Sequence, residues 1–579
     1  MAYDKTRPRP SWRPTVMGKH YAVSCGHPLA ASAASRILER GGNAVDAGVA
    51  ASMALAIVQP DIVSFAGVAP TLIYINPERK VHGIAGLGTW PASTDVERLR
   101  DEGGGMAIPD GLLRTVMPAA PATHIEALRR FGTISFEEAA TAAFELARDG
   151  FAAYPAFVRH IEKNEQKYRR WDSSVAVYLP EGRPPCVGEI FRQPELAQSI
   201  AAMMQAERNA SGNRDAKLRA AHDYYYKGPI AQTVADYHRA HRGFVSRDDL
   251  AAFTTPVEPA LHASYRGYEV HVNDVWCQGI SLLQALKLLE RVDVRALGHN
   301  TPAYIHRVIE SLNLAFADRE AYLGDPRFVE VPVGGLLSDQ YAAEQYARIR
   351  DDIAFGKLPL PGKPPGATRE PFIPDISKFP RADKGAAPDT IYCCVVDGMG
   401  NAYSATLSDS SSDTPVIPGY GGNISSRGRQ SRLEPGHPSE VQPGKRPRLT
   451  PSPALALRDG EFAIAFGTPG GDVQLQAMLQ VFLNATTFGM QLQEAIEQPR
   501  FGTFLFPSSF SPFKVGEINM ESRIPACTVD ALKALGHPIE LWDTLAPAAG
   551  AVCAIMRDAK TGWLHAGADP RREAYAIAW

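Results

Sequence analysis

The chain has 579 residues, of which 45% are hydrophobic and 21% are charged, a composition typical of a soluble globular protein with a large core. The formal net charge is −3, so no overall basic field favours binding to nucleic acid or to an anionic membrane. The longest apolar stretch, residues 47–58, is shorter than the roughly 20 residues that cross a bilayer. Residues 1–20 are charged and proline-rich and lack the apolar centre of a secretory signal. We therefore expect a cytoplasmic protein that binds neither nucleic acid nor membrane.

Seven cysteines in a chain of this length do not indicate a disulfide framework, and their number is odd. No CxxC pair or His/Cys spacing indicates a structural metal, and no Walker-type or dinucleotide glycine motif is found. We expect reduced thiols in the core, no metal site and no cofactor.

The N-terminal half is predicted to start with two helices. Residues 27–43 carry a helical apolar stripe that ends at Gly41-Gly42, a plausible C-cap. Asn43 resembles a helix start, and the small-residue helix after it ends before Pro60. Residues 69–86 predict a hairpin that turns at Asn76-Pro77.

Residues 120–250 follow a mainly helical pattern, and residues 265–275 return to a strand pattern. Thr301-Pro302 indicates the start of another helix. Its apolar face comprises Ile305, Val308, Leu312 and Phe316.

Residues 357–389 are rich in proline, glycine and charge and predict an exposed, flexible linker. Two alternating runs then flank a turn at 398–400, which indicates a hairpin. Pairing Asp397 with Asn401 puts Tyr392 opposite Thr406 and Thr390 opposite Ser408. Directly opposed Cβ atoms lie roughly 4.5–5.5 Å apart, so the hydroxyls at 390 and 408 could interact. A bulge in the loop would shift this register by one residue.

Beyond the hairpin, residues 415–448 form a Gly/Ser/Arg-rich loop long enough to be functional or mobile. Two further hairpins are predicted, one at 454–466 turning at Asp459-Gly460 and one at 552–567. Between them, residues 467–471 lead into an amphipathic helix that we expect to begin at Asp472.

A threonine at the start of a strand is usually structural, but it can act as a nucleophile if a base lies within reach. Cleavage of the preceding peptide bond would free the α-amine of Thr390, which supplies such a base. An α-amino pKa of about 7.7–8.0 suits general-base work near neutral pH. Gly470-Gly471, at the helix entry, could aim backbone N–H groups at an oxyanion or could form a plain tight turn.

Segments in order along most of the chain resemble the γ-glutamyltransferase family, heterodimeric N-terminal nucleophile hydrolases made by self-cleavage of one precursor. These segments are ILERGGNAVDAGVAASMALAIVQP, NLAFADREAYLGDPRFVEVPV, DTIYCCVVDGMGNAYSAT, PGKRPRLTPSPALALRDG, FGTPGGDVQ and HAGADPRR. The resemblance implies an α+β protein with an αββα four-layer sandwich. It also implies a large chain, 1–389, and a small chain, 390–579, that together form one fold.

By this resemblance, cleavage falls between Asp389 and Thr390, and Thr390 is both the self-cleaving residue and the nucleophile. Ser408 matches a second hydroxyl that supports the nucleophile's amine. Gly470 and Gly471 match the pair that forms the oxyanion hole.

The substrate side matches less completely. Thr450 corresponds to one of two hydroxyls beside the substrate carboxylate, and the other position is Leu449. Ser410 stands where the family has an asparagine. Gln430 falls, in an alignment that needs gaps, near the acidic residue that holds the glutamyl α-amino group. Thr406, opposite Tyr392, is a further candidate for substrate binding.

The transferases also have a loop arginine that clamps the glutamyl α-carboxylate, whereas residues 87–91 read LGTWP here. The loss of both the arginine and the carboxylate removes the charged contacts that select a zwitterionic glutamyl group. Trp90, beside the missing arginine, either makes the acyl pocket flatter and more apolar or is simply packed. Arg427 or Arg429 is an alternative carboxylate anchor unless these are solvated loop arginines.

Residues 423–438, NISSRGRQSRLEPGHP, resemble the acylase- and amidohydrolase-like branch, which includes oxamate amidohydrolase and cephalosporin acylases. We expect hydrolysis of a small-molecule amide through an acyl-enzyme, and acyl transfer to amines is left open. Whether the processed heterodimer forms a homo-oligomer is also left open. One alternative is a γ-glutamyl hydrolase or transferase acting on glutathione. Another is an unprocessed binding protein without catalysis.

Overall fold

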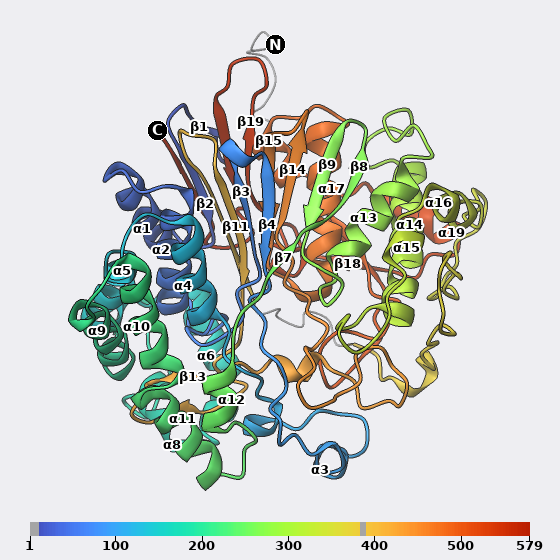
Figure 1. Ribbon diagram of the computed structural model, residues 1–579. Coiled ribbons are helices and arrows are strands. Elements are labelled where there is room, and N and C mark those ends of the chain that lie inside the picture. Colours follow the sequence, from blue (N-terminus) through green and yellow to red (C-terminus); the bar gives the residue numbers. More distant parts are fainter. Residues whose placement is uncertain (1–10, 383–389) are drawn as a thin grey trace.

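Two stacked sheets with helices on both outer faces form the centre of the protein (Figure 1). The computed structural model describes residues 11–382 and 390–579. Each central sheet has seven strands, in the orders β21-β2-β10-β11-β3-β4-β7 and β1-β20-β19-β15-β14-β9-β8. The layers run helix, sheet, sheet, helix, so the predicted αββα sandwich is confirmed.

The first sheet is antiparallel throughout, and helices α1 and α2 lie directly against it. Its strands are β21 (Tyr575–Ala578), β2 (Ala22–Cys25), β10 (Ile391–Val396), β11 (Ala402–Leu407), β3 (Thr71–Ile75), β4 (Lys80–Ile84) and β7 (Val257–Pro259). The helices on this side are α1 (Pro28–Glu39), α2 (Ala44–Val58), α3 (Val96–Glu102), α4 (Ala120–Phe131), α5 (Phe136–Asp149), α6 (Pro155–Lys163), α7 (Glu165–Tyr168), α8 (Asp172–Tyr178), α9 (Pro194–Asn209), α10 (Arg214–Tyr226), α11 (Pro229–Ala240) and α12 (Arg247–Ala252).

The second sheet is covered by α13, α14 and α17. Its strands are β1 (Val16–Gly18), β20 (Leu564–Ala568), β19 (Cys553–Arg557), β15 (Glu461–Gly467), β14 (Ala454–Arg458), β9 (Tyr268–Val272) and β8 (Leu261–Tyr265). The helices are α13 (Gly279–Leu289), α14 (Pro302–Tyr322), α15 (Val333–Leu336), α16 (Asp339–Tyr346), α17 (Gln474–Thr486), α18 (Leu492–Glu497) and α19 (Ala526–Ala534). Smaller sheets join β16 (Phe501–Thr503), β17 (Ile518–Glu521) and β18 (Ile539–Trp542), β5 (Phe151–Ala152) and β6 (Ile190–Phe191), and β12 (Val416–Ile417) and β13 (Gly422–Asn423).

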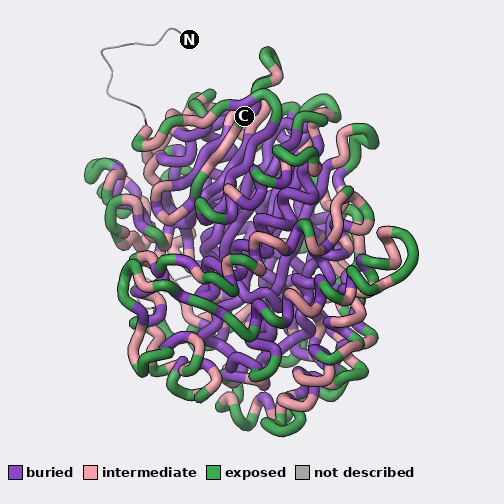
Figure 2. Tube along the Cα trace, turned by 90° about the vertical axis from the view of Figure 1, so that its left-hand side faces the viewer, coloured by how far each residue is buried: buried purple, intermediate pink, exposed green. Residues whose placement is uncertain are grey.

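Strand β10 is buried on both faces because it lies inside the first sheet. Figure 2 shows that buried chain fills the middle of the protein, whereas the exposed segments lie at its periphery. Cys393 and Val395 pack against the helices, whereas Tyr392 and Cys394 pack between the two sheets. The adjacent residues Cys393 and Cys394 therefore face opposite sides of the strand. The period of two along a strand also turns Thr390 toward the layer between the sheets.

Most of the predicted elements are present. The hairpins at 69–86, 454–466 and 552–567 form β3-β4, β14-β15 and β19-β20. Asn43 caps α2 with a capping box, and the Thr301 hydroxyl caps α14.

Two predicted boundaries were wrong. The strand expected at 265–275 is β9 alone, preceded by a turn at Arg266-Gly267 that joins it to β8. Helix α17 begins at Gln474, because residues Gly471–Val473 form a 3₁₀ turn first.

The described part of the predicted linker, 357–382, contains one short 3₁₀ turn, Ile376–Lys378, and no other helix or named strand. Leu358 and Phe379 are buried and fix it to the protein body. Residues 383–389, with Asp389 of the predicted cleavage bond, lie outside the described residues. The division into two chains therefore stays a prediction. The loop at 415–448, expected to be functional or mobile, is largely buried.

All seven cysteines are unpaired. Five are buried as expected, but Cys186 and Cys527 are exposed, so the interpretation as core thiols was wrong for these two. Among the described residues, every helix is too short or too polar to cross a membrane.

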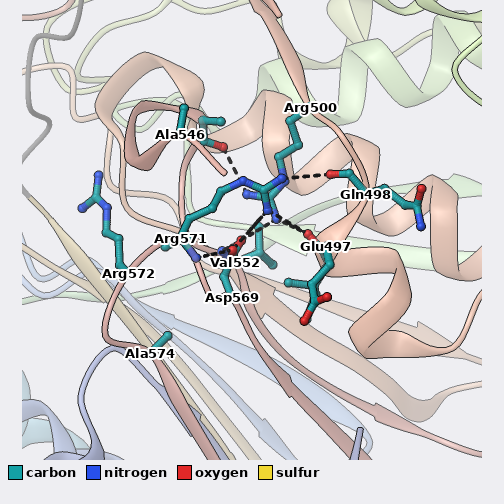
Figure 3. Close-up of polar contacts among 12 residues, drawn as sticks. Glu497, Gln498, Arg500, Ala546, Val552, Asp569, Arg571, Arg572 and Ala574 are labelled. Carbon is teal, nitrogen blue, oxygen red and sulfur yellow. Dashed lines mark hydrogen bonds and ion pairs between the residues drawn. The ribbon is translucent and has the colours of Figure 1, made fainter. Parts of the chain in front are cut away.

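The HAGADPRR segment forms a buried ion cluster at the end of the second sheet (Figure 3). Arg571 donates to both carboxylate oxygens of Glu521, over 2.8 and 2.7 Å. Asp569 accepts from Arg500 over 2.6 Å and lies 3.1 Å from Arg571 Nη1. Burial raises the pKa of Asp569, but Arg500 and Arg571 outweigh it and hold this pKa below its usual value. The charged residues of this segment thus have a structural role, because they form buried ion pairs.

We predict that Arg571→Met destabilises the protein by about 3–5 kcal/mol, because it leaves buried carboxylates without their partner. Urea unfolding monitored by fluorescence measures the change. Arg557→Met is the control, since Arg557 lies 3.9 Å from Glu461 in a partly exposed pair and should cost less than about 1 kcal/mol. Equal effects of the two substitutions would contradict the prediction.

Candidate active site

Two hydroxyl groups meet where β10 begins and β11 ends. The register pairs Tyr392 with Thr406 and Ile391 with Leu407, as predicted from the turn. Thr390 Oγ1 therefore lies 2.7 Å from Ser408 Oγ, and both residues are fully buried. The predicted contact between the two hydroxyls is confirmed.

The backbone is strained on both sides of this contact. Thr390 has a φ of 106° and Asp409 a φ of 126°. Positive φ is a genuine outlier for a β-branched residue such as threonine and costs of order 1–3 kcal/mol. The backbone N–H of Thr390 donates to the carbonyl of Ile62 over 3.3 Å. Strain of this kind is typical of functional sites.

Arg427 lies beside Ser408 instead of in a solvated loop. It is fully buried in the 3₁₀ turn Arg427–Gln430, and its Nη2 donates to Ser408 Oγ. Its Nε lies 3.0 Å from a carboxylate oxygen of Asp409. A guanidinium can only donate, so Ser408 Oγ accepts from Arg427 and its own proton remains available for Thr390 Oγ1.

Asp409 is already fully engaged by neighbouring donors. Besides Arg427, it accepts from Ser425 Oγ over 2.7 Å and from Ser426 N and Oγ over 3.1 and 2.9 Å. This carboxylate fixes Arg427 next to the two hydroxyls.

A second buried carboxylate, Asp413, is surrounded by cations. Arg429 Nη1 contacts it directly, and Lys167 Nζ and Arg114 Nη1 lie 3.8 and 3.9 Å away. Burial raises the pKa of Asp413, but these cations outweigh burial and hold it well below its usual range. Arg114 also pairs with Asp110 over 2.5 Å, and Asp110 in turn binds Arg170 over 2.6 Å. Two carboxylates thus face four cations here, so this side of the site favours a further anion.

The oxyanion candidates adopt backbone conformations that only glycine takes readily. Gly470 has a φ of 128° and Gly471 a φ of 57°. A Cβ atom on Gly471 would lie 2.9 Å from the ring of Phe510. Within the described part of the chain, neither backbone N–H donates a hydrogen bond. Two unused amides at this turn are what an oxyanion hole requires.

Phe510 joins the glycine turn to the arginines. Its ring centroid lies 5.4 Å from the guanidinium carbon of Arg427 and 4.9 Å from that of Arg429. These are cation–π distances, so one aromatic ring orients both cations and also contacts Gly471.

Gln430 and Thr450, both predicted to bind substrate, bind each other. Gln430 Nε2 donates to Thr450 Oγ1 over 2.8 Å, and the Thr450 backbone N–H donates to Gln430 Oε1 over 3.4 Å. Gln278 donates to the carbonyls of Thr450 and Gly471 over 2.9 and 3.1 Å. This network connects the pair to the oxyanion turn.

The remaining sequence candidates are also buried. Thr406 Oγ1 has no hydrogen-bond partner in the described part of the structure. Ser410 Oγ lies 3.1 Å from Ser412 Oγ. Trp90 is packed and 1% exposed, and its Nε1 donates to Ser431 Oγ over 2.9 Å. Trp90 supports the turn that carries Arg427. Of the two alternatives for this residue, a wall of the acyl pocket or a packed side chain, the structure therefore favours the packed side chain.

Sequence reasoning missed Asp409, Asp413, Gln278 and Phe510. Asp409 follows Ser408 directly, and an acidic residue beside a predicted catalytic hydroxyl was a usable signal. Phe510 lies far from the other site residues in the sequence, in a loop without a recognisable pattern. Only the folded chain brings it to the arginines.

The family model described as gamma-glutamyltranspeptidase matches residues 30–579. The chain belongs to this family. Its relatives include hydrolase and acylase proenzymes, so hydrolase chemistry of the family type is supported.

Three relatives illustrate the breadth of the family. The chain is 28% identical to the glutathione hydrolase-like YwrD proenzyme of Bacillus subtilis (strain 168), over 97% of this chain and 99% of that protein. It is 31% identical to the acylase ACY 1 proenzyme of Pseudomonas sp. (strain SE83), over 90% and 88% of the two chains. The crystal structure of cephalosporin acylase from Bacillus halodurans superposes with a TM-score of 0.85 at 26% identity, covering 100% of this chain and 99% of that one.

We predict that Ser408→Ala folds but raises the reaction barrier by about 1–3 kcal/mol, which lowers kcat roughly 5- to 150-fold. The control is Ser404→Ala in the same strand, because Ser404 Oγ bonds Tyr392 and not Thr390. Steady-state kinetics of the two variants measure the difference. An unchanged kcat in Ser408→Ala would show that the hydroxyl contact has no catalytic role.

Proposed function

We propose that the protein is a self-processing N-terminal threonine amidohydrolase with Thr390 as nucleophile. The observation that carries this proposal is the 2.7 Å contact between Thr390 Oγ1 and Ser408 Oγ, beside the buried Arg427. Arg427 polarises Ser408, and Ser408 can donate to a developing negative charge on Thr390 Oγ1.

Among the described residues, the two groups next to this hydroxyl that could be considered as a base are poorly suited to that role. The nitrogen of Thr390 is a peptide amide, which is not basic, and the Asp409 carboxylate is occupied by four donor atoms. Cleavage before Thr390 would convert the amide into an amine, the missing base. The strained φ of Thr390 favours such a step, since breaking the peptide bond releases the strain.

In self-cleavage, Thr390 Oγ attacks the carbonyl carbon of residue 389 and forms an ester, while the Thr390 nitrogen leaves as an amine. Water then hydrolyses the ester, which frees the carboxylate of residue 389 and the hydroxyl of Thr390.

In turnover, Thr390 Oγ attacks the substrate amide carbonyl while its proton passes to the α-amine. The amides of Gly470 and Gly471 stabilise the oxyanion, and the α-ammonium protonates the leaving amine as the carbon–nitrogen bond breaks. Water, or an acceptor amine in a transfer reaction, then attacks the acyl-enzyme and releases Thr390.

Purified protein should resolve into two chains on a denaturing gel, with the smaller beginning Thr-Ile-Tyr-Cys-Cys by N-terminal sequencing. Thr390→Ala should stay intact and inactive, because it has neither the attacking oxygen nor a route to the amine. A single full-length band from the wild type after prolonged incubation would contradict the proposal and favour a non-catalytic binding protein.

The substrate that we propose is a small amide whose acyl part carries a negative charge and is not a glutamyl group. Residues 87–91 offer no arginine, and Leu87 and Trp90 of this segment are core residues. The cations Arg429, Lys167 and Arg114 around Asp413 favour an acyl carboxylate. No described carboxylate in this cluster remains for a substrate ammonium, because Asp409 and Asp413 are both paired.

We expect glutathione to be a poor substrate, because charged hydrogen bonds contribute roughly 1.5–3 kcal/mol each and two are missing. The loss in kcat/KM should reach about 10²- to 10⁴-fold relative to the best amide. Side-by-side kinetics on processed enzyme should compare glutathione, a γ-glutamyl anilide, small acidic amides and matched neutral amides.

If glutathione is turned over well above every other amide, the protein is instead a glutathione hydrolase. The full-length similarity to a glutathione hydrolase-like proenzyme keeps this second candidate in view. Mass spectrometry of the acyl group trapped on Thr390 would identify the substrate class directly.

A further inference from the structure

A second cluster of chemically active side chains lies in the outer helical layer, near the N-terminal end of α14. His306 and Glu310 occupy successive turns of one face of α14, and His537 lies between α19 and β18. All three are at most 3% exposed. One donor atom from each side chain lies within 4.8 Å of the others.

The hydrogen bonds of the two imidazoles define where the protons are. His306 Nε2 lies 2.7 Å from the carbonyl of Arg350, which can only accept, so this nitrogen carries the proton. His306 Nδ1 therefore accepts, and its neighbour at 2.8 Å, His537 Nε2, donates.

This assignment leaves acceptors facing one another. In a neutral ring, His537 Nδ1 carries a lone pair, and it lies 3.6 Å from Glu310 Oε1. In the described part of the structure, neither Glu310 oxygen nor His537 Nδ1 completes a hydrogen bond. The Phe355 amide and Asn313 lie beside Glu310. Burying these acceptors without donors is costly, so a cation bound among them would be favourable.

We propose that His306, Glu310 and His537 form a structural zinc site. Two imidazole nitrogens and a carboxylate oxygen are ligands that Zn²⁺ prefers. The His306 ring already has the outer contact typical of a metal ligand, a ring N–H donated to a backbone carbonyl.

The geometry requires only a small adjustment. Zinc–nitrogen bonds of about 2.0–2.1 Å at a tetrahedral angle separate two nitrogens by about 3.3 Å. Zinc would bind His306 Nδ1 and His537 Nε2, which are 2.8 Å apart, so the loop that carries His537 must move by about half an ångström. The proton of His537 would then lie on Nδ1, which faces Glu310 Oε1. A fourth ligand, from water or from the second Glu310 oxygen, would complete the coordination.

Such a site would join parts of the chain that are distant in sequence. It would tie α14 to the loop after α19, and through Arg350 to the segment that leads into residues 357–382. The backbone N–H of Ala354 also donates to Leu535 over 2.7 Å, so this segment is already held next to the cluster. The site is independent of the proposed catalytic reaction.

The experiment uses untagged full-length protein, because an affinity tag would itself bind zinc. The protein is stripped with a chelator, reloaded with zinc chloride, dialysed, and analysed by inductively coupled plasma mass spectrometry. We expect about one tightly held zinc ion per chain and a melting temperature that falls on stripping and recovers on reloading. Loading with Co²⁺ should give the visible absorption of a tetrahedral site with nitrogen and oxygen ligands.

Removal of a residue that only hydrogen-bonds a metal ligand lowers metal affinity roughly 10- to 100-fold. Glu310→Gln and His537→Gln each remove a ligand, so each should lower zinc affinity by more than this. The matched control is Glu269→Gln. Glu269 lies with His262 and His271 in a more exposed His/Glu/His group that could bind zinc adventitiously.

Zinc retention unchanged in both cluster variants, or lost only in Glu269→Gln, would overturn the proposal. Failure of the stripped wild-type protein to retain zinc after reloading would also overturn the proposal. A proton shared between Glu310 and His537 would then neutralise the buried carboxylate. These readouts do not use enzyme activity, so failure of the zinc site and failure of the proposed reaction are distinguishable.

Discussion

The candidate site depends on the pairing of β10 with β11. Their register places Thr390 and Ser408 opposite each other just beyond the last paired residues. Both faces of β10 are buried, and Tyr392 packs so closely on Gly467 that a Cβ there would lie 2.3 Å from its ring. A slip of one residue would turn Tyr392 toward the helices and separate the two hydroxyls. The core that fixes the strand register thus also holds the Thr390 and Ser408 hydroxyls in contact.

Around this hairpin, buried ion pairs surround the two hydroxyls. Arg427 and Arg429 are held by Asp409 and Asp413 and rest on Phe510, so their positions are set before any substrate binds. A cation beside Ser408 stabilises negative charge on the neighbouring oxygen, and two unused glycine amides suit a second negative oxygen. Such preorganised groups need little rearrangement during a reaction. Their desolvation is a cost that the large double-sheet core offsets.

The sequence was most informative where one local rule decides the structure. The turn at 398–400 fixed the alternation of β10 and β11, and from it the contact of Thr390 with Ser408. The glycine pair at 470–471 was singled out by its place before a predicted helix and by the family resemblance, and both glycines have positive φ. The partners of Arg427 could not be predicted in this way, since Asp409 lies beyond the paired residues of β11 and its φ of 126° departs from the strand pattern. Phe510, Gln278 and the His306 cluster depend on contacts between distant segments, which no local pattern encodes.

Strands from the two sides of residue 390 alternate within both central sheets. In the first sheet, β10 and β11 lie between β2 and β3. In the second, β20, β19, β15 and β14 lie between β1 and β9. A break before Thr390 would therefore divide the chain without dividing the fold, because each fragment supplies inner strands to the other. Once unfolded, such a protein would have to reassemble from two molecules, and its refolding would become bimolecular and dependent on concentration. The processed protein would then depend on kinetic stability, that is, on slow unfolding, more than on efficient refolding.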